Sequence, residues 1–286
     1  MFKSTGFVVC LFFLFTQPVF SSDKMKKENF IISPGGVLIE YVLENGSIKG
    51  SGSLPESKQW SDSYWPSYDR KNGLIYFEAE HKGSGWSRQI FFIAIDDKKM
   101  NPIRVVEGRQ PSISLDGSML AYSRHPNQLW LFDIKSKESK KAASDILAAQ
   151  PVVWISSKDL LYSDLNNNLV RYDIGAGKAD KTGHDHVIPG ALSPGENRVL
   201  CGSYDGSKIL MYTINTNKIE VLKKSILFSM GSSFVWSRNG KYFLYTKQTL
   251  SNLIRLNESR SLYRYAFGGE ETLLIDKFSL FGGFSK

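Results

Sequence analysis

The feature that most constrains the fold of this chain is a repeat with a period near 40 residues. Short apolar runs of one kind recur every 37 to 46 residues. These runs are Val37–Tyr41, Leu74–Glu78, Leu120–Arg124, Leu160–Asp164, Val199–Ser203 and Phe243–Lys247. A period of this length is typical of a β-propeller, in which each repeat forms one four-stranded blade.

The residues around each run support this interpretation. A turn cluster precedes each run, as in Asn72-Gly73, Asp116-Gly117 and Asn239-Gly240, and tight hairpins need residues that tolerate a positive φ. Most copies have one strand before the turn, one after the run and a weak fourth strand at the end. The sequence therefore predicts an all-β fold, a six-bladed propeller of four-stranded antiparallel blades. A β-sandwich or a two-sheet solenoid of the same short strands is the alternative.

The two ends of the chain suggest how the ring closes. Leu280–Ser285 has the pattern of the first strand of a copy that is never completed. Val37–Tyr41 and Ser47–Gly50 would complete that blade, so we expect closure by pairing of the N- and C-terminal strands. Phe30–Ser33 competes for the same inner position.

The N-terminus has the pattern of an export signal. Lys3 precedes an apolar run from Gly6 to Phe20, and Val19-Phe20-Ser21 has small or tolerated residues at the positions before a cleavage site after Ser21. We therefore expect a signal peptide at 1–21, a short basic linker at 22–29 and a single propeller domain at 30–286, located in a periplasm or secreted. A retained membrane anchor is the alternative, but the run is short and Pro18 interrupts it. No later segment is long and apolar enough to cross a bilayer.

Several copies resemble a known repeat family. Gln110–Gly117, Leu120–Tyr122 and Leu129–Asp133 are similar to the Pro-x-aromatic-Ser-Pro-Asp-Gly, Leu-Ala-Phe/Tyr and Leu-Trp-x-x-Asp elements of the TolB-type (WD40-like) propeller repeat. The resemblance covers nearly the whole mature chain. It implies the propeller fold, but says little of function, because this repeat occurs in periplasmic scaffolds, in peptidase-linked propellers and in some sugar-active proteins.

The repeat register places the histidines on one face of the ring. His81 and His125 follow second strands, and His184 and His186 precede an inner strand. In a four-stranded blade these positions share one face, where loops converge on the central channel. We expect a ligand face there, with Asp164, Asp185 and Asp205 beside the histidines.

The residues at this face suggest two kinds of chemistry, metal binding and acid/base catalysis. His125, His184 and His186 could bind a divalent metal ion, although a polar turn without a ligand explains the same residues. Glu78 and Glu80 share a strand face, which could suit acid/base catalysis, but solvated charge explains them equally. The sequence has no Gly-x-Ser-x-Gly elbow and no phosphate-binding loop, and Cys201 lies in an apolar strand. No complete set of catalytic residues is present.

Other residues bear on packing and partners. Three tryptophans are expected at equivalent places between blades: Trp130, Trp154 and Trp236. Four other aromatic residues lie near loops and could hold a glycan or protein: Trp60, Tyr64, Trp65 and Trp86.

The formal charge of +8 comes from scattered lysine groups. They form either a solvated rim or a contact for an anionic partner such as lipid headgroups, a glycan or an acidic protein. Nucleic acid is disfavoured by the export signal and by the lack of a recognition motif.

Together these observations favour an exported, non-catalytic propeller that acts as a protein-binding or scaffold module through one face and the channel mouth. The expected partner is an envelope or secreted protein, or a peptide segment, with no cofactor. The alternative is a metal-dependent carbohydrate-active enzyme, a lyase or hydrolase of acidic oligosaccharides, with His125, His184 and His186 as ligands.

Overall fold

The computed structural model describes residues 28–32, 39–44, 47–53, 60–81, 88–94, 102–147, 150–225, 229–248 and 260–278. The regular elements in these ranges are all β-strands. Accordingly, none of the described residues belongs to a helix that could span a membrane. The predicted signal peptide lies outside the described residues.

Five sheets have four strands each, paired antiparallel. Blades 1 and 2 are β4 (Trp60–Asp69), β5 (Leu74–His81), β6 (Arg88–Ala94) and β7 (Ile103–Glu107), then β8 (Arg109–Ile113), β9 (Met119–Arg124), β10 (Gln128–Asp133) and β11 (Ser139–Ala143). Blade 3 is β12 (Val153–Trp154), β13 (Asp159–Ser163), β14 (Asn168–Asp173) and β15 (Lys178–Asp185). Blades 4 and 5 are β16 (Val187–Leu192), β17 (Arg198–Ser203), β18 (Lys208–Thr213) and β19 (Lys218–Lys224), then β20 (Ser229–Trp236), β21 (Tyr242–Gln248), β22 (Arg260–Ala266) and β23 (Glu271–Phe278).

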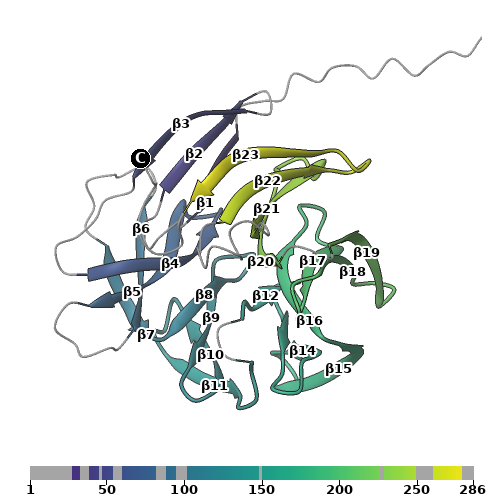
Figure 1. Ribbon diagram of the computed structural model, residues 1–286. Coiled ribbons are helices and arrows are strands. Elements are labelled where there is room, and N and C mark those ends of the chain that lie inside the picture. Colours follow the sequence, from purple (N-terminus) through teal and green to yellow (C-terminus); the bar gives the residue numbers. More distant parts are fainter. Residues whose placement is uncertain are drawn as a thin grey trace, which may run out of the picture.

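The blades are arranged as a ring around a central axis (Figure 1). The first strand of each blade is innermost, and consecutive first strands contact one another from β4 through β8, β12 and β16 to β20. The fourth strand of each blade lies at the rim. The propeller fold and the four-stranded antiparallel blade are thus as the sequence predicts.

The prediction of six such blades is wrong: the described residues contain five. The repeat at the N-terminus forms a three-stranded sheet of β1 (Glu28–Ile32), β2 (Ile39–Glu44) and β3 (Ser47–Ser53). β1 pairs with β2 along its whole length, so it occupies the edge of β2 that the predicted C-terminal strand would need. The predicted closing strand, Leu280–Ser285, lies outside the described residues.

The three-stranded sheet lies between blade 5 and blade 1 (Figure 1). Leu43 of β2 belongs to the same buried cluster as Tyr242 and Leu244 of β21, and β1 contacts β4. Apolar contact with blade 5 and the proximity of β1 to β4 therefore place this sheet in the ring.

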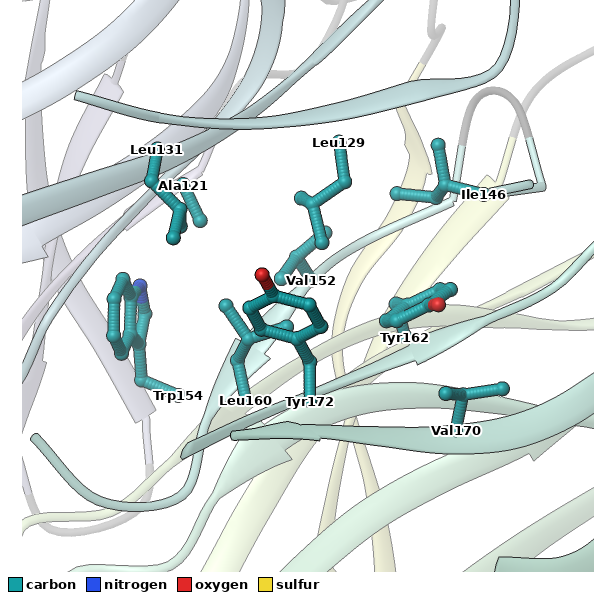
Figure 2. Packing of buried hydrophobic residues seen from close by; sticks show 10 residues of the cluster. All are labelled: Ala121, Leu129, Leu131, Ile146, Val152, Trp154, Leu160, Tyr162, Val170 and Tyr172. Carbon is teal, nitrogen blue, oxygen red and sulfur yellow. The ribbon is translucent and has the colours of Figure 1, made fainter. Parts of the chain in front are cut away.

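Each blade buries one apolar face against the next blade. Figure 2 shows this between blades 2 and 3, where Ala121 and Leu131 face Trp154 and Leu160 across the junction. Equivalent clusters join blades 1 and 2, blades 3 and 4, and blades 4 and 5. Burial of apolar area contributes about 25 cal/mol per Å², so these junctions stabilise the ring.

Two inner-strand tryptophans also link neighbouring blades by hydrogen bonds. The Trp154 indole donates to the carbonyl oxygen of Ser112 (2.8 Å), and the Trp236 indole donates to that of Ala191 (3.0 Å). Each bond runs from one inner strand to the preceding one. Trp130 is not equivalent to these two, because it lies in a third strand and its indole donates to Gln128 of its own strand.

The strand register corrects the alignment of one repeat. Ile75 pairs with Tyr68 in the way that Leu120 pairs with Ile113, so Ile75, not Leu74, is the equivalent of Leu120. The Leu74–Phe77 run is apolar at every position, so the alternation that would fix its register is missing.

Gly108 provides a test of the junction packing. A Cβ atom at this position would lie 2.3 Å from the ring of the buried Tyr122. We expect Gly108→Ala to lower the free energy of unfolding by roughly 1–3 kcal/mol, as overpacked cores do. Urea denaturation measures this effect. Gly195→Ala is the matched control, because a Cβ there meets no atom within 4 Å, and an equal loss in both variants would contradict the account.

Candidate functional site

The predicted ligand face is built from two kinds of loop. In each blade, the turn between the second and third strands lies at the same end as the connection to the next blade. We call this end of blades 2 to 4 the histidine face. It comprises residues 124–128, 144–147, 164–168, 184–186 and 203–208.

Backbone hydrogen bonds join these loops across blades 2 and 3. The connection between the blades runs between two turns and bonds to both of them. The Ile146 amide donates to Asn127 O (3.1 Å), and the Leu165 amide donates to Asp145 O (2.7 Å). In addition, the Leu147 amide donates to Ser163 O (2.7 Å).

The same arrangement continues into blade 4. The His186 amide donates to Asn167 O (2.7 Å), and the Tyr204 amide donates to His186 O (2.9 Å). Asn127, Asn167 and His186 all have a positive φ, of 52°, 62° and 54°. Non-glycine residues adopt this conformation at a cost, which these bonds offset. We call these five hydrogen bonds the backbone arc.

Asp164 shapes one of the turns. Its side chain is 2% exposed and accepts hydrogen bonds from the amides of Asn166 and Asn168 and from Asn168 Nδ2. Lys181 Nζ lies 3.7 Å away. The carboxylate oxygens therefore hold the turn in place. Because they already accept these hydrogen bonds, they can accept few from a ligand.

Asp205 has a similar part in the turn of blade 4. It accepts hydrogen bonds from the hydroxyls of Ser203 and Ser207 and from the Ser207 amide. These bonds lower the pKa of the Asp205 carboxyl to about 2, so the group is ionised at neutral pH and cannot act there as an acid.

The histidines do not converge on one point. His184 Nε2 lies 2.9 Å from Asn217 O, and the His184 ring contacts Tyr212 edge-on. The His186 ring instead lies 6.4 Å from the ring of Tyr204. His184 lies within a bulge of β15 opposite Leu169 and contacts the β18–β19 hairpin turn at Asn217, whereas His186 contacts Tyr204 in the β17–β18 turn. The two rings therefore contact opposite ends of blade 4.

The other predicted residues are more dispersed. His125 is exposed in the β9–β10 turn, and Asp185 is exposed at the end of β15. His81 ends β5, and its side chain lies outside the described residues. Among the described residues, no three His, Cys, Asp or Glu side chains are grouped as a metal site would require. Metal binding by His125, His184 and His186 stays a prediction.

Two apolar side chains at this face were missed by the sequence analysis. Leu165 is 47% exposed and Tyr204 is 52% exposed, at the tips of the corresponding turns of blades 3 and 4. Both could have been identified from the sequence, because each is a large side chain within an otherwise polar turn. The backbone arc fixes both turns, so these side chains stand on rigid supports.

A buried polar group lies at the junction of blades 1 and 2. Glu78 is 3% exposed and accepts hydrogen bonds from the Gln110 amide (2.6 Å) and from Arg88 Nη1 (3.0 Å). Burial raises the pKa of Glu78, although these two bonds act in the opposite direction. Gln110 has a φ of 52°, and its side chain accepts a bond from Ser123. The carboxylate thus holds a left-handed residue of the next blade.

The remaining candidates have structural surroundings. Cys201 is fully buried, and burial raises the pKa of its thiol, which disfavours the reactive thiolate. Trp65 is partly buried in β4 with a φ of 53°, the conformation that Gln110 has in the next inner strand. Trp86 and the side chains of Trp60 and Tyr64 lie outside the described residues.

Comparisons with known proteins define the fold without assigning a family. No family model and no curated protein matches this chain. A candidate TolB from Agrobacterium tumefaciens has a similar structure, with a TM-score of 0.60 and 12% identity over 80% of this chain and 87% of that one.

Two oligogalacturonate lyases are also similar in structure. One was solved in complex with manganese, and the other is from Vibrio parahaemolyticus. Both have TM-scores of 0.51 and 12% identity, covering 87% of this chain and 72% and 71% of theirs. At such identities the likeness extends to the propeller fold alone.

Glu78 makes the stability of the protein depend on pH. A carboxyl whose pKa is raised by folding stabilises the folded state fully below its unfolded pKa, near 4.3. This contribution to the free energy of unfolding is lost as the pH rises through the raised pKa of the folded state. We therefore expect wild type to lose stability relative to Glu78→Gln between pH 4 and pH 7. Urea denaturation at several pH values measures the difference, with exposed Glu196→Gln as control. A difference independent of pH would contradict the assignment.

Proposed function

We propose that this protein is an exported binding module that holds a peptide segment or another envelope or secreted protein against the histidine face and the adjoining channel mouth. The observation that carries the proposal is the backbone arc, which fixes the loops of three consecutive blades at one end of the ring. Rigid loops bind with little loss of conformational entropy, because they are ordered before the partner arrives.

The exposed side chains on this support suit a protein partner. Tyr204 and Leu165 are about half exposed. His186 provides a hydrogen-bonding group beside Tyr204, and His125 is exposed in the β9–β10 turn of the same face. Large aromatic residues on rigid supports are frequent anchors at protein interfaces. An extended segment lying across blades 3 and 4 would contact both apolar side chains.

The surroundings of Asp164 and Asp205 at this face, and of Glu78 in a blade junction, favour binding over catalysis. Asp164 and Asp205 are hydrogen-bonded within their own turns. Glu78 bonds to Gln110 and Arg88 inside a blade junction. General acid–base catalysis needs a group that can reach the substrate with a pKa near the working pH. Asp164 is too deeply buried to reach a substrate, and the hydrogen bonds of Asp205 lower the pKa of its carboxyl to about 2. The export signal at 1–21 is part of the proposal and places the partner in a periplasm or outside the cell.

Site-specific photo-crosslinking in the native host tests the binding face. A photoreactive residue replaces Tyr204 or Leu165 in separate variants, and adducts are detected by a shift in mass on denaturing gels. We expect a specific adduct from both positions, because both would lie under the partner. Tyr68 and Leu115 are matched controls, as they are similarly exposed but lie in β4 and the β8–β9 turn, towards the opposite end of the ring. Equal adducts from both ends, or none, would contradict the proposal.

Metal analysis tests the enzymatic alternative. The purified protein is equilibrated with Mn²⁺ and desalted, and its metal content is measured by plasma mass spectrometry. We expect well under one ion per chain, because His184 and His186 contact different neighbours. One ion per chain that is lost in a His184→Ala, His186→Ala variant would favour the alternative instead.

A further inference from the structure

The third-to-fourth strand hairpins of the blades differ in charge. The turn residues are Lys135-Ser136-Lys137 in blade 2, Gly175-Ala176-Gly177 in blade 3 and Asn215-Thr216-Asn217 in blade 4. Only the first of these three turns is charged. Lys140 and Lys141 follow it in β11, so four lysines and a single acidic residue, Glu138, fall within residues 135–141.

Lys137 occupies a position that the fold does not favour for lysine. Its φ is 63°, and the equivalent residues Gly177 and Asn217 have φ values of 63° and 51°. Glycine and asparagine are the usual residues in this left-handed conformation, whereas other side chains are disfavoured there. The lysine is therefore present at a cost to folding. Its Nζ lies 5.9 Å from the centroid of the Phe132 ring, and the residue is exposed to solvent.

The turn that carries these charges is firmly held. Asp133 Oδ1 accepts bonds from the amides of Lys135 (2.8 Å) and Ser136 (2.7 Å), and the Asp133 and Lys137 amides bond to Glu138 O and Asp133 O. All four lysines are exposed, and none forms an ion pair with a carboxylate among the described residues. On blade 3, by contrast, Arg171, Lys178 and Lys181 are paired with aspartates.

We propose that the β10–β11 hairpin docks the propeller on an anionic lipid surface through Lys135, Lys137, Lys140 and Lys141. Clusters of this size are attracted to anionic headgroups without a shaped pocket. The hairpin lies at the outer rim of the ring, away from the β1–β3 sheet (Figure 1). A flat lipid surface could therefore reach it. A glycan site would need a cleft or an exposed aromatic platform, and the nearest aromatic residues of β10 are Phe132, which is buried, and Trp130, which lies under Arg124.

The proposed contact is compatible with binding at the histidine face. β10 runs from the histidine face at Gln128 to the hairpin turn after Asp133. The lysines of the turn therefore lie at the opposite end of the blade. A propeller docked by this rim would keep the backbone arc accessible to a partner.

Sedimentation with lipid vesicles tests the proposal on the full chain. Vesicles of phosphatidylcholine with phosphatidylglycerol are compared with vesicles of phosphatidylcholine alone. The latter report any binding through the apolar run at 6–20. Each lysine near an anionic surface contributes about fivefold in partitioning, so Lys135→Asn with Lys137→Gly is expected to weaken binding to the anionic vesicles by roughly 25-fold. Binding of wild type is expected to fall as salt is added.

The choice of variants separates binding from folding. Asn and Gly are residues that equivalent turns already carry, so the thermal midpoint is expected to stay the same or rise. Lys140→Gln with Lys141→Gln is a second variant that leaves the turn intact and is expected to weaken binding similarly. Lys218→Gln with Lys224→Gln removes the same charge from the outer strand of blade 4 and is expected to retain most of the binding.

Several results would overturn the proposal. These are equal binding to both kinds of vesicle, unchanged binding by both hairpin variants, or an equal loss in the blade 4 control. Retention on immobilised heparin without binding to anionic vesicles would also overturn it, and would indicate an anionic polysaccharide as the ligand.

Discussion

The structure depends on the packing of each blade against the next. In the four-stranded blades, the second strand directs alternate side chains forward to one neighbour and backward to the other, as Ala121 and Leu120 do in blade 2. The apolar junctions fix the angle between blades, and the indole bonds of Trp154 and Trp236 fix the height of the inner strands. The positions of the loops at the two ends of the ring follow from these contacts. A binding face made of loops from three blades is possible because the junctions are rigid.

Much of this fold could be predicted from the sequence. The period near 40 residues and the Gly- and Asn-containing turns indicated four-stranded blades. The strands predicted to include Gln110 and Leu129 are β8 and β10 of the structure. The number of four-stranded blades could not be predicted. Phe30–Ser33 and Leu280–Ser285 both had the pattern of an inner strand, and pattern alone does not determine which of two such segments pairs with β2.

The candidate site was predictable only in part. Strand order placed His125 and His186 in loops at one end of the ring, since that depends on the alternating direction of antiparallel strands. The side-chain directions of His184 and His186 depend on a three-residue bulge opposite Leu169, which the sequence Thr182-Gly183-His184 does not reveal. The backbone arc was also invisible, because hydrogen bonds between main-chain groups leave no signature in residue identity. Asn127 and Asn167 were the only related indication in the sequence, because asparagine tolerates the positive φ found there.

The central claim is that the histidine face is rigid before any partner binds. Amide hydrogen exchange of the free protein, resolved by NMR, tests this most directly at Ile146, Leu165, His186 and Tyr204. These amides are four of the five donors of the backbone arc, so they are predicted to exchange as slowly as amides of the inner strands, although they lie in loops. Exchange at the rate of open, solvent-exposed loops would contradict the account and would leave the face without its fixed support.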